Sequence, residues 1–170
     1  MGELLEKIKT KKAKIGIVGL GYVGLPLALE FVRSGYCVTG IDKNKERVES
    51  LKKGTSYVID VKSEDIAQFI EKGLFRVTDD TSVLSTLDAI SICVPTPLTK
   101  TKDPDMSYII NVSQEVKNYL HKDQLFILES TTYPGTTEEL VLPMLAEGGL
   151  TVGKDFYLAF SPERIDPGNK

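Results

Sequence analysis

The stretch that decides the fold is Lys14-Ile15-Gly16-Ile17-Val18-Gly19-Leu20-Gly21-Tyr22-Val23-Gly24-Leu25-Pro26. A short apolar run precedes three glycines spaced G-x-G-x-x-G, and a helix-like pattern follows them. In such a turn the first glycine permits a tight bend, the second lets the backbone approach a pyrophosphate, and the third lets helix and strand pack closely. The helix N-terminus adds unpaired N–H groups and a partial positive charge of about half an elementary unit. We therefore expect Gly19, Gly21 and Gly24 to form a dinucleotide-binding turn.

Strand-like and helix-like segments alternate along the rest of the chain. Strands are predicted over residues 13–18, 36–41, 74–78, 87–94, 125–128 and 155–160. Helices are predicted over 22–34, 43–53, 63–71 with Ser63 as the N-cap, 81–85, 107–120 and 136–146. This alternation predicts an α/β fold with a parallel sheet between two layers of helices. With the glycine turn after the first strand, we predict the doubly wound Rossmann order 3-2-1-4-5-6, with ligands outside the carboxyl ends of the strands.

Composition excludes several classes of protein. The formal net charge of −3 over 170 residues gives no reason to expect a nucleic-acid partner. No apolar run approaches the roughly 20 residues that cross a membrane, and the basic N-terminus lacks the apolar segment of a secretion signal, so we expect a cytoplasmic protein. Cys37 and Cys93 lie in apolar runs and are interpreted as small buried residues. The single histidine, His121, is interpreted as a solvated surface residue, and no metal site is expected.

The chain is predicted to have three parts. Residues 1–12 form a basic leader that can fold as a short amphipathic helix with Leu4, Leu5 and Ile8 on one face, and we expect it to be solvated. Residues 13–160 form the Rossmann domain, and residues 161–170 begin the connection to a further domain that this sequence does not contain.

Asp42 indicates which dinucleotide binds. It follows the second predicted strand, 18 residues after Gly24, where a carboxylate can accept hydrogen bonds from the ribose hydroxyls of an adenosine. A 2′-phosphate at this place would meet the Asp42 carboxylate, so we favour NAD over NADP. The nearby cations Lys43, Lys45 and Arg47 keep NADP open, and a simple turn residue is the alternative interpretation of Asp42.

Three further groups lie where later strands end. Thr96 lies between two prolines on a stiff loop that can press against a planar ligand, although an ordinary strand-ending turn explains it as well. The Ser130-Thr131-Thr132 hydroxyls can bind the nicotinamide ribose or position a water, and they can equally cap the next helix. Glu163 can orient a water or transfer a proton, or it can form a salt bridge.

These motifs together resemble one enzyme family. They are Gly19 to Ala28, Asp42, Cys93-Val94-Pro95-Thr96-Pro97, Glu129-Ser130-Thr131 and Ser161-Pro162-Glu163-Arg164. In this order they resemble the N-terminal NAD-binding domain of the UDP-glucose/GDP-mannose dehydrogenase family, over about residues 13–170. The segments Tyr57 to Val61, Thr96 to Asp105 and Arg164 to Asn169 are most similar to its UDP-N-acetylglucosamine 6-dehydrogenase branch.

The resemblance implies an activity and a set of contacts. The family oxidises the primary alcohol of a nucleotide sugar to a carboxylate in two NAD-dependent hydride transfers, through a thioester on an enzyme cysteine. Carried over by position, the residues that contact NAD are Val23 with its neighbour Tyr22, Asp42, Arg47, Thr96 and Thr131. Thr131 and Glu163 also place the water that hydrolyses the thioester, with Glu163 as the candidate base.

The family's nucleophilic cysteine, its catalytic lysine and the adjacent asparagine belong to later segments, and neither Cys37 nor Cys93 matches the nucleophile. We therefore expect this chain to bind NAD without turning over, and the full-length protein to be a homodimer acting on a UDP-sugar, with an N-acetylhexosamine sugar favoured. Two alternatives stay open: a standalone dinucleotide-binding or redox-sensing module, and another NAD-dependent oxidoreductase.

Overall fold

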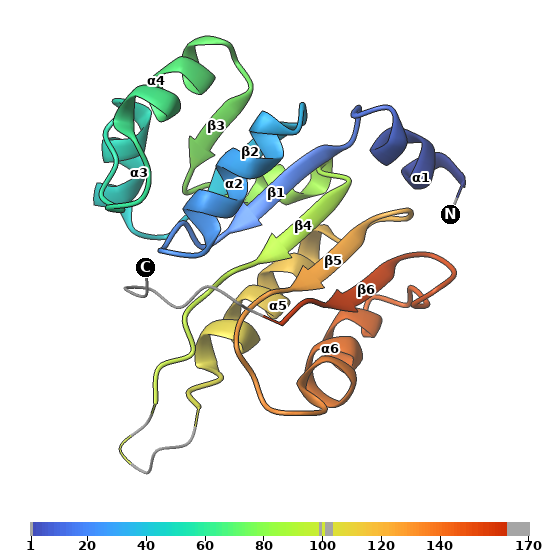
Figure 1. The fold of residues 1–170 in the computed structure, drawn as a ribbon. Coiled ribbons are helices and arrows are strands. Elements are labelled where there is room, and N and C mark those ends of the chain that lie inside the picture. The colour runs from blue at the N-terminus through green and yellow to red at the C-terminus, as the bar shows by residue number, and fades with distance from the viewer. Residues whose placement is uncertain (1, 99, 101–103, 163–170) are drawn as a thin grey trace.

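A parallel sheet of six strands forms the centre of the molecule (Figure 1). The computed structural model describes residues 2–98, 100 and 104–162. The strands are β1 (Lys14–Val18), β2 (Cys37–Ile41), β3 (Phe75–Thr78), β4 (Ala89–Ile92), β5 (Leu125–Leu128) and β6 (Tyr157–Phe160). Their order is β3-β2-β1-β4-β5-β6, with every neighbouring pair parallel. The predicted doubly wound Rossmann order is confirmed, and the order reverses between β1 and β4.

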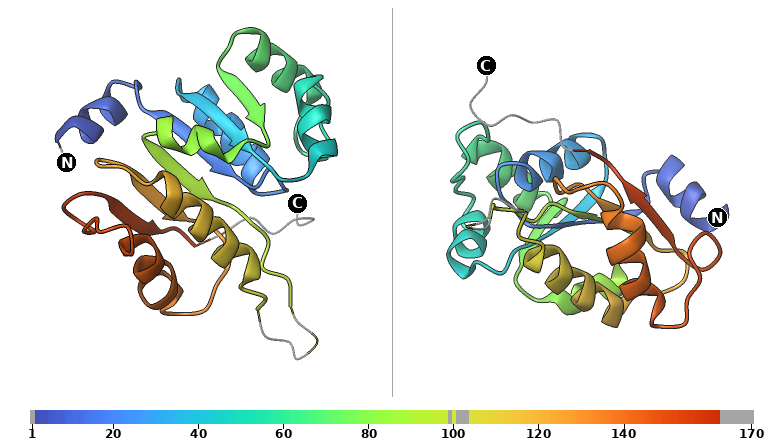
Figure 2. Two further views of the ribbon diagram at one scale, coloured as in Figure 1. Left: turned by 180° about the vertical axis from the view of Figure 1, so that it is seen from behind. Right: turned by 90° about the horizontal axis from the view of Figure 1, so that it is seen from below.

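Helices cover both faces of this sheet (Figures 1 and 2). One face carries α2 (Gly24–Arg33), α3 (Lys45–Lys52) and α4 (Ser63–Glu71), which pack a core that contains Leu25, Leu51 and Ile66. The other face carries η1 (Thr81–Thr86), α5 (Ser107–Tyr119), η2 (Thr136–Val141) and α6 (Leu142–Ala146), which pack a second core around Ile90 and Phe126. Because strand side chains alternate between faces, β1 contributes Ile15 and Ile17 to the first core and Val18 to the second.

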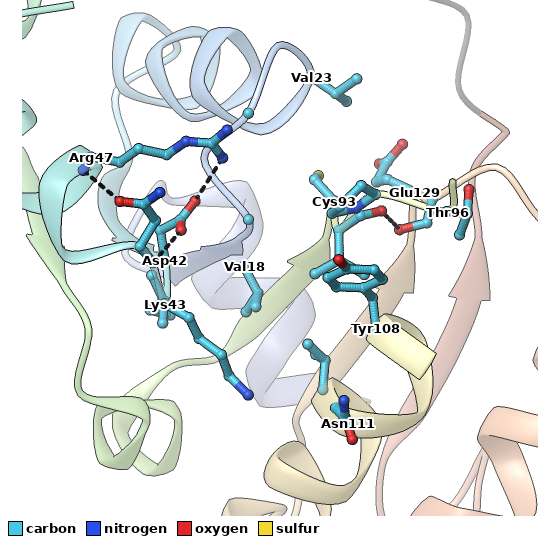
Figure 3. Close-up of a pocket in the computed structure, with 18 of the residues that line it drawn as sticks. Val18, Val23, Asp42, Lys43, Arg47, Cys93, Thr96, Tyr108, Asn111 and Glu129 are labelled. Carbon is cyan, nitrogen blue, oxygen red and sulfur yellow. Dashed lines mark hydrogen bonds and ion pairs between the residues drawn. The ribbon is translucent and has the colours of Figure 1, made fainter. Parts of the chain in front are cut away.

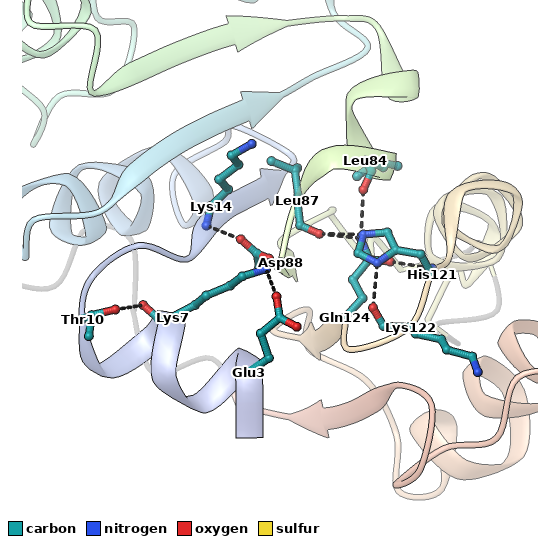
Figure 4. Close-up of polar contacts among 10 residues, drawn as sticks. All are labelled: Glu3, Lys7, Thr10, Lys14, Leu84, Leu87, Asp88, His121, Lys122 and Gln124. Carbon is teal, nitrogen blue, oxygen red and sulfur yellow. Dashed lines mark hydrogen bonds and ion pairs between the residues drawn. The ribbon is translucent and has the colours of Figure 1, made fainter. Parts of the chain in front are cut away.

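The N-terminal segment forms a helix, α1 (Gly2–Lys9), as its amphipathic pattern predicts. The expectation that it is solvated holds for five of its eight residues, which are exposed, and is wrong for Leu4, which is only 5% exposed. Lys7 Nζ lies 2.9 Å from Asp88 Oδ1, and the other oxygen of Asp88 accepts a hydrogen bond from the main-chain N–H of Lys14 (Figure 4). The helix therefore docks at the amino ends of β1 and β4.

Some element boundaries differ from the sequence prediction for local reasons. The strand predicted over residues 87–94 is shorter, Ala89–Ile92, because Leu87 ends η1 and residues 93–97 leave the sheet. Lys62, not Ser63, is the N-cap of α4, since the Ser63 hydroxyl accepts a hydrogen bond from the N–H of Ser56. The helix predicted over 136–146 is divided into a π-helical turn, η2, and the short α6.

Candidate functional site

A pocket of about 690 Å³ opens at the carboxyl ends of the central strands. The glycine turn, the residues after β2, the loop after β4 and the segment after β5 line it, together with one face of α5. Figure 3 shows Asp42 and Arg47 on one side of this pocket and Cys93, Thr96 and Glu129 on the other. The pocket lies where the strand order reverses, which is the place where open α/β sheets bind ligands.

Each of the three glycines in the turn has a different structural reason to lack a side chain. Gly19 has a φ of +91°, and a Cβ there would lie 2.6 Å from the carbonyl oxygen of Cys93. A Cβ on Gly24 would lie 1.8 Å from the carbonyl oxygen of Gly19, so only glycine fits between turn and helix. A Cβ on Gly21 would meet no protein atom within 4 Å. Since the protein's own packing does not require a glycine at position 21, this missing side chain leaves space for a ligand in the pocket.

Helix α2 begins directly after this turn. Its N-cap residue is Val23, and no side chain caps the helix there. Helix N-termini carry unpaired N–H groups and a partial positive charge, and both favour a phosphate. Val23 is half-buried and Tyr22 is 54% exposed, and both side chains line the pocket. The turn and α2 thus fit the pyrophosphate of a dinucleotide.

Asp42 is buried at the end of β2, with 9% of its surface exposed. Its Oδ2 accepts a hydrogen bond from the main-chain N–H of Leu20 at 2.8 Å, and its Oδ1 accepts one from the N–H of Asn44 at 2.8 Å. Arg47 Nη1 lies 3.6 Å from the same Oδ2. Each carboxylate oxygen retains acceptor capacity for a ribose hydroxyl, so Asp42 holds the glycine turn and still offers a site for adenosine.

Tyr57 is a residue that the sequence analysis missed. Its hydroxyl donates a hydrogen bond to the carbonyl oxygen of Leu20 at 2.6 Å, and the guanidinium of Arg47 lies 5.5 Å from the centre of its ring. Burial raises the pKa of the Tyr57 phenol, the negative charge of Asp42 raises it further, and Arg47 opposes the rise. Tyr57 falls in the segment between α3 and α4 that has no periodic pattern. It entered the sequence analysis only as part of the Tyr57 to Val61 resemblance and was assigned no role in the site.

Thr96 and Thr131 are brought together by the loops after β4 and β5. The Thr96 hydroxyl donates a hydrogen bond to the main-chain carbonyl of Thr131 at 2.7 Å. The Ser130 hydroxyl is buried and donates to the carbonyl of Val94 at 2.7 Å, so it joins the same two loops. The alternative that these hydroxyls cap the next helix is wrong, because Gly135 is the N-cap of η2 and no side chain caps it.

One face of α5 forms a wall of the pocket that the sequence analysis also missed. Tyr108, Asn111, Val112 and Glu115 line it, and Lys43, after the end of β2, forms an ion pair with Glu115. Figure 3 shows Lys43 together with Tyr108 and Asn111. The four positions on α5 follow the i, i+3, i+4, i+7 spacing of one helix face. The polar members of this face are the signal that points to a ligand, because the adjacent face of α5, formed by Ile109, Val112, Ser113 and Val116, packs into the core.

The expectations for cysteine and histidine are corrected in part. Cys93 is buried and lines the pocket just beyond the end of β4. Cys37 is exposed, because it begins β2 next to the exposed Lys14 at the amino end of the sheet. His121 is half-buried, with Nε2 at 3.1 Å from the carbonyl oxygen of Leu87. Glu163 lies outside the described residues.

Residues 2–98, 100 and 104–162 contain neither a metal-binding cluster nor a membrane-spanning helix. No group of three or more His, Cys, Asp or Glu residues in these ranges is arranged to hold a metal ion. None of the helices in the same ranges combines the length and hydrophobicity that a membrane crossing requires.

Known proteins match this chain along nearly its whole length. Residues 13–170 match the UDP-glucose/GDP-mannose dehydrogenase family, NAD binding domain. A UDP-N-acetyl-D-glucosamine 6-dehydrogenase of Salmonella typhi is 41% identical over 160 residues, which cover 94% of this chain and 37% of that protein. The chain thus spans about 37% of the length of the curated relatives named here.

Solved structures of nucleotide-sugar dehydrogenases also match this chain along nearly its whole length. The UDP-D-ManNAc dehydrogenase of Pyrococcus horikoshii superposes with a TM-score of 0.85 at 37% identity, covering 91% of this chain and 37% of that one. The GDP-mannose dehydrogenase of Pseudomonas aeruginosa, solved as a ternary complex, has a TM-score of 0.85 at 28% identity and covers 90% of this chain and 36% of that one. This chain therefore belongs to the UDP-glucose/GDP-mannose dehydrogenase family and carries its NAD-binding domain.

Proposed function

We propose that this chain is the cofactor-binding part of a nucleotide-sugar 6-dehydrogenase that oxidises the primary alcohol of a UDP-sugar to the carboxylate. The observation that carries the proposal is the match of residues 13–170 to the NAD-binding domain of that family. The relatives named UDP-N-acetyl-D-glucosamine 6-dehydrogenase and UDP-N-acetyl-D-mannosamine dehydrogenase favour a UDP-N-acetylhexosamine as the sugar. The activity is assigned to the full-length protein.

The proposed contacts to NAD follow the layout of the pocket. The turn at Gly19, Gly21 and Gly24, with Tyr22 and Val23, receives the pyrophosphate at the N-terminus of α2. Asp42 accepts the adenosine ribose hydroxyls, with Arg47 beside it. Thr96 faces the nicotinamide half, because it lies across the pocket from Asp42 (Figure 3). Thr131 lies beside it, since the Thr96 hydroxyl donates to the Thr131 carbonyl. Bound NAD supplies the acceptor for a hydride from the sugar carbon.

Thr131 and Glu163 are proposed to position the hydrolytic water. Thr131 is exposed on the loop after β5, and its carbonyl is fixed by the hydrogen bond from Thr96. This bond fixes the main chain of Thr131, which is one of the residues that line the pocket. The role of Glu163 as the base rests on the family resemblance of the Ser161 to Arg164 motif.

The remaining assignments stay predictions. We propose the division into a leader of residues 1–12, a Rossmann domain of residues 13–160 and a connection beginning at residue 161. A homodimer of the full-length protein and a cytoplasmic location are also proposed. They are tested by the mass of the full-length protein in solution and by fractionation of the cells that produce it.

Calorimetric titration of the 170-residue chain with NAD and NADP tests the cofactor assignment. We expect NAD to bind at least about tenfold more tightly, because the 2′-phosphate of NADP would meet the buried Asp42 carboxylate. Tighter binding of NADP would contradict this assignment. The full-length protein should reduce two NAD per molecule of UDP-N-acetylglucosamine or UDP-N-acetylmannosamine, and turnover of neither sugar would contradict the proposed substrate class.

A further inference from the structure

Leu20 lies between the first two glycines of the turn, and both of its main-chain polar groups are bonded to side chains. Its N–H donates to Asp42 Oδ2 at 2.8 Å, and its carbonyl oxygen accepts from the Tyr57 hydroxyl at 2.6 Å. The Leu20 side chain is fully buried in the first core. The peptide units on either side of Leu20 are therefore fixed from two directions, and these units lead directly into Gly21.

Arg47 joins the two side chains that hold Leu20. Its guanidinium lies 3.6 Å from Asp42 Oδ2 and 5.5 Å from the centre of the Tyr57 ring. Arg47 belongs to α3, Asp42 follows β2, and Tyr57 lies between α3 and α4. We call Leu20, Asp42, Arg47 and Tyr57 the turn clamp. Three separate segments of the chain thus converge on one residue of the turn.

Tyr57 belongs to this clamp without being part of the larger pocket. Among the described residues, those that line the larger pocket include Asp42 and Arg47 but not Tyr57. Tyr57 instead lines a smaller cavity of about 380 Å³, which shares Gly21, Tyr22, Asn44 and Arg47 with the larger pocket. Its hydroxyl is directed to the Leu20 carbonyl, so this hydrogen bond acts on a pyrophosphate through the main chain of the turn.

We propose that Tyr57 is a positioning residue of the cofactor site, which fixes the glycine turn in the shape that receives the pyrophosphate before the cofactor arrives. A turn that is already ordered loses less conformational entropy on binding, so the binding free energy is more favourable by the entropic cost that is avoided. The phenol of a tyrosine is protonated at neutral pH, and burial raises the pKa of Tyr57 further, so the hydrogen bond to Leu20 persists under physiological conditions. This inference rests on the proposed placement of the pyrophosphate at the turn.

The test compares ligands that contain a pyrophosphate with one that does not. NAD, ADP and adenosine are titrated into the 170-residue chain and into Tyr57→Phe, which keeps the ring beside Arg47 and loses only the hydroxyl. We expect Tyr57→Phe to bind NAD and ADP about 5- to 10-fold more weakly, which is the usual effect of one lost hydrogen bond. Adenosine affinity should change less than about twofold, because adenosine does not use the turn.

Tyr36→Phe is the matched control. The Tyr36 hydroxyl also donates to a main-chain carbonyl, that of Ile8 at 3.0 Å, but it lies at the opposite end of the sheet from the pocket. This variant should bind all three ligands as the wild-type chain does. Amide hydrogen exchange of the ligand-free chain gives a second measurement, and exchange at residues 20–24 should be faster in Tyr57→Phe than in Tyr36→Phe.

The outcomes separate this inference from the proposed function. If the wild-type chain binds neither NAD nor ADP, the placement of the pyrophosphate is wrong. If the wild-type chain binds both and Tyr57→Phe binds them equally well, the positioning role is wrong. An equal loss for ADP and adenosine would also overturn it, since Tyr57 would then act on the adenosine site and not through the turn.

Discussion

Asp42 and Leu20 are joined by a buried hydrogen bond, in which the Leu20 N–H donates to Asp42 Oδ2 at 2.8 Å. The other carboxylate oxygen accepts from the N–H of Asn44, so both oxygens of Asp42 serve main-chain donors. The residue proposed to select the cofactor therefore also holds the turn that is proposed to bind it. This double use predicts the effect of replacing Asp42.

Asp42→Asn should weaken both the fold and NAD binding. An asparagine has one oxygen, so its amide NH2 would face one of the two main-chain N–H groups and leave it unpaired. A buried unpaired group costs about 1–3 kcal/mol, which lowers the melting temperature of a domain of this size by about 2–10 °C. Thermal denaturation and calorimetry measure the two effects. Asp60→Asn, at an exposed position, is the control, and an unchanged melting temperature in Asp42→Asn would contradict the double role.

Gly21 and Gly24 should respond to substitution in opposite ways. Gly21→Val should keep the fold and abolish NAD binding, because its side chain would enter open space in the pocket where the pyrophosphate is proposed to lie. Gly24→Ala should destabilise the fold, because its Cβ would lie 1.8 Å from the Gly19 carbonyl oxygen. Circular dichroism melts and NAD titrations distinguish the two. Wild-type NAD affinity in a folded Gly21→Val chain would show that the pyrophosphate lies elsewhere.

The architecture of the sheet could be predicted from the sequence, because the order of strands and helices follows from local periodicity. The alternation of strand and helix patterns and the glycine turn were enough to predict the sheet order that the structure has. The position of Asp42 at the end of β2 followed from the same pattern. These features are set by residues that are near one another in the chain, and local patterns report such features directly.

The sequence could not show contacts between distant segments. The bond from Tyr57 to Leu20 spans 37 residues, and the bond from Lys7 to Asp88 spans 81. Neither pair has a spacing that any local pattern reports, so the role of Tyr57 in the site and the docking of α1 were not predicted. The exposure of Cys37 has a similar cause, because it depends on the place of β2 beside β1 at the amino end of the sheet.

Thr96→Val should weaken NAD binding more than ADP binding. The substitution removes the 2.7 Å hydrogen bond to the Thr131 carbonyl, which joins the loops proposed to hold the nicotinamide half. The loss of one such bond predicts an affinity for NAD that is lower by about fivefold, with ADP unchanged. Thr86→Val is a matched control, since the Thr86 hydroxyl donates to the Val83 carbonyl at 2.8 Å outside the pocket. Equal effects on NAD and ADP would argue against the nicotinamide assignment.

Tyr57 should make the folded chain sensitive to alkaline pH. Burial and the Asp42 charge raise the pKa of the phenol in the folded state above its ordinary value of about 10. The folded state then holds the proton more strongly than the unfolded state, so the stabilisation is complete below pH 10 and is lost as the pH rises toward the folded pKa. Urea unfolding at pH 9 and pH 11 measures the loss, which should be smaller in Tyr57→Phe. An identical loss in both chains would contradict the coupling.

A substitution at Gln124 tests whether the stability of the fold can change without a change in cofactor affinity. It is fully buried beside the amino end of β5, and its Nε2 donates to the carbonyls of Leu84 and Leu87, each at 2.8 Å (Figure 4). Gln124→Met keeps the shape of the side chain but removes both hydrogen bonds, each of which contributes about 0.5–1.5 kcal/mol. The two carbonyls keep one partner each, since the Leu84 carbonyl still accepts from the Leu87 N–H and the Leu87 carbonyl still faces His121 Nε2. The melting temperature should fall.

The affinity of Gln124→Met for NAD should nevertheless equal that of the wild-type chain at a temperature where both are folded, because the pocket lies at the opposite end of the strands. Gln68→Met, at an exposed position on α4, controls for the change of residue type and should leave both quantities unchanged. A folded Gln124→Met chain with weakened NAD binding would show that the amino ends of the strands influence the glycine turn. We expect the amino and carboxyl ends of the strands to respond independently, because every neighbouring pair of strands in the sheet is hydrogen-bonded and the sheet is therefore rigid.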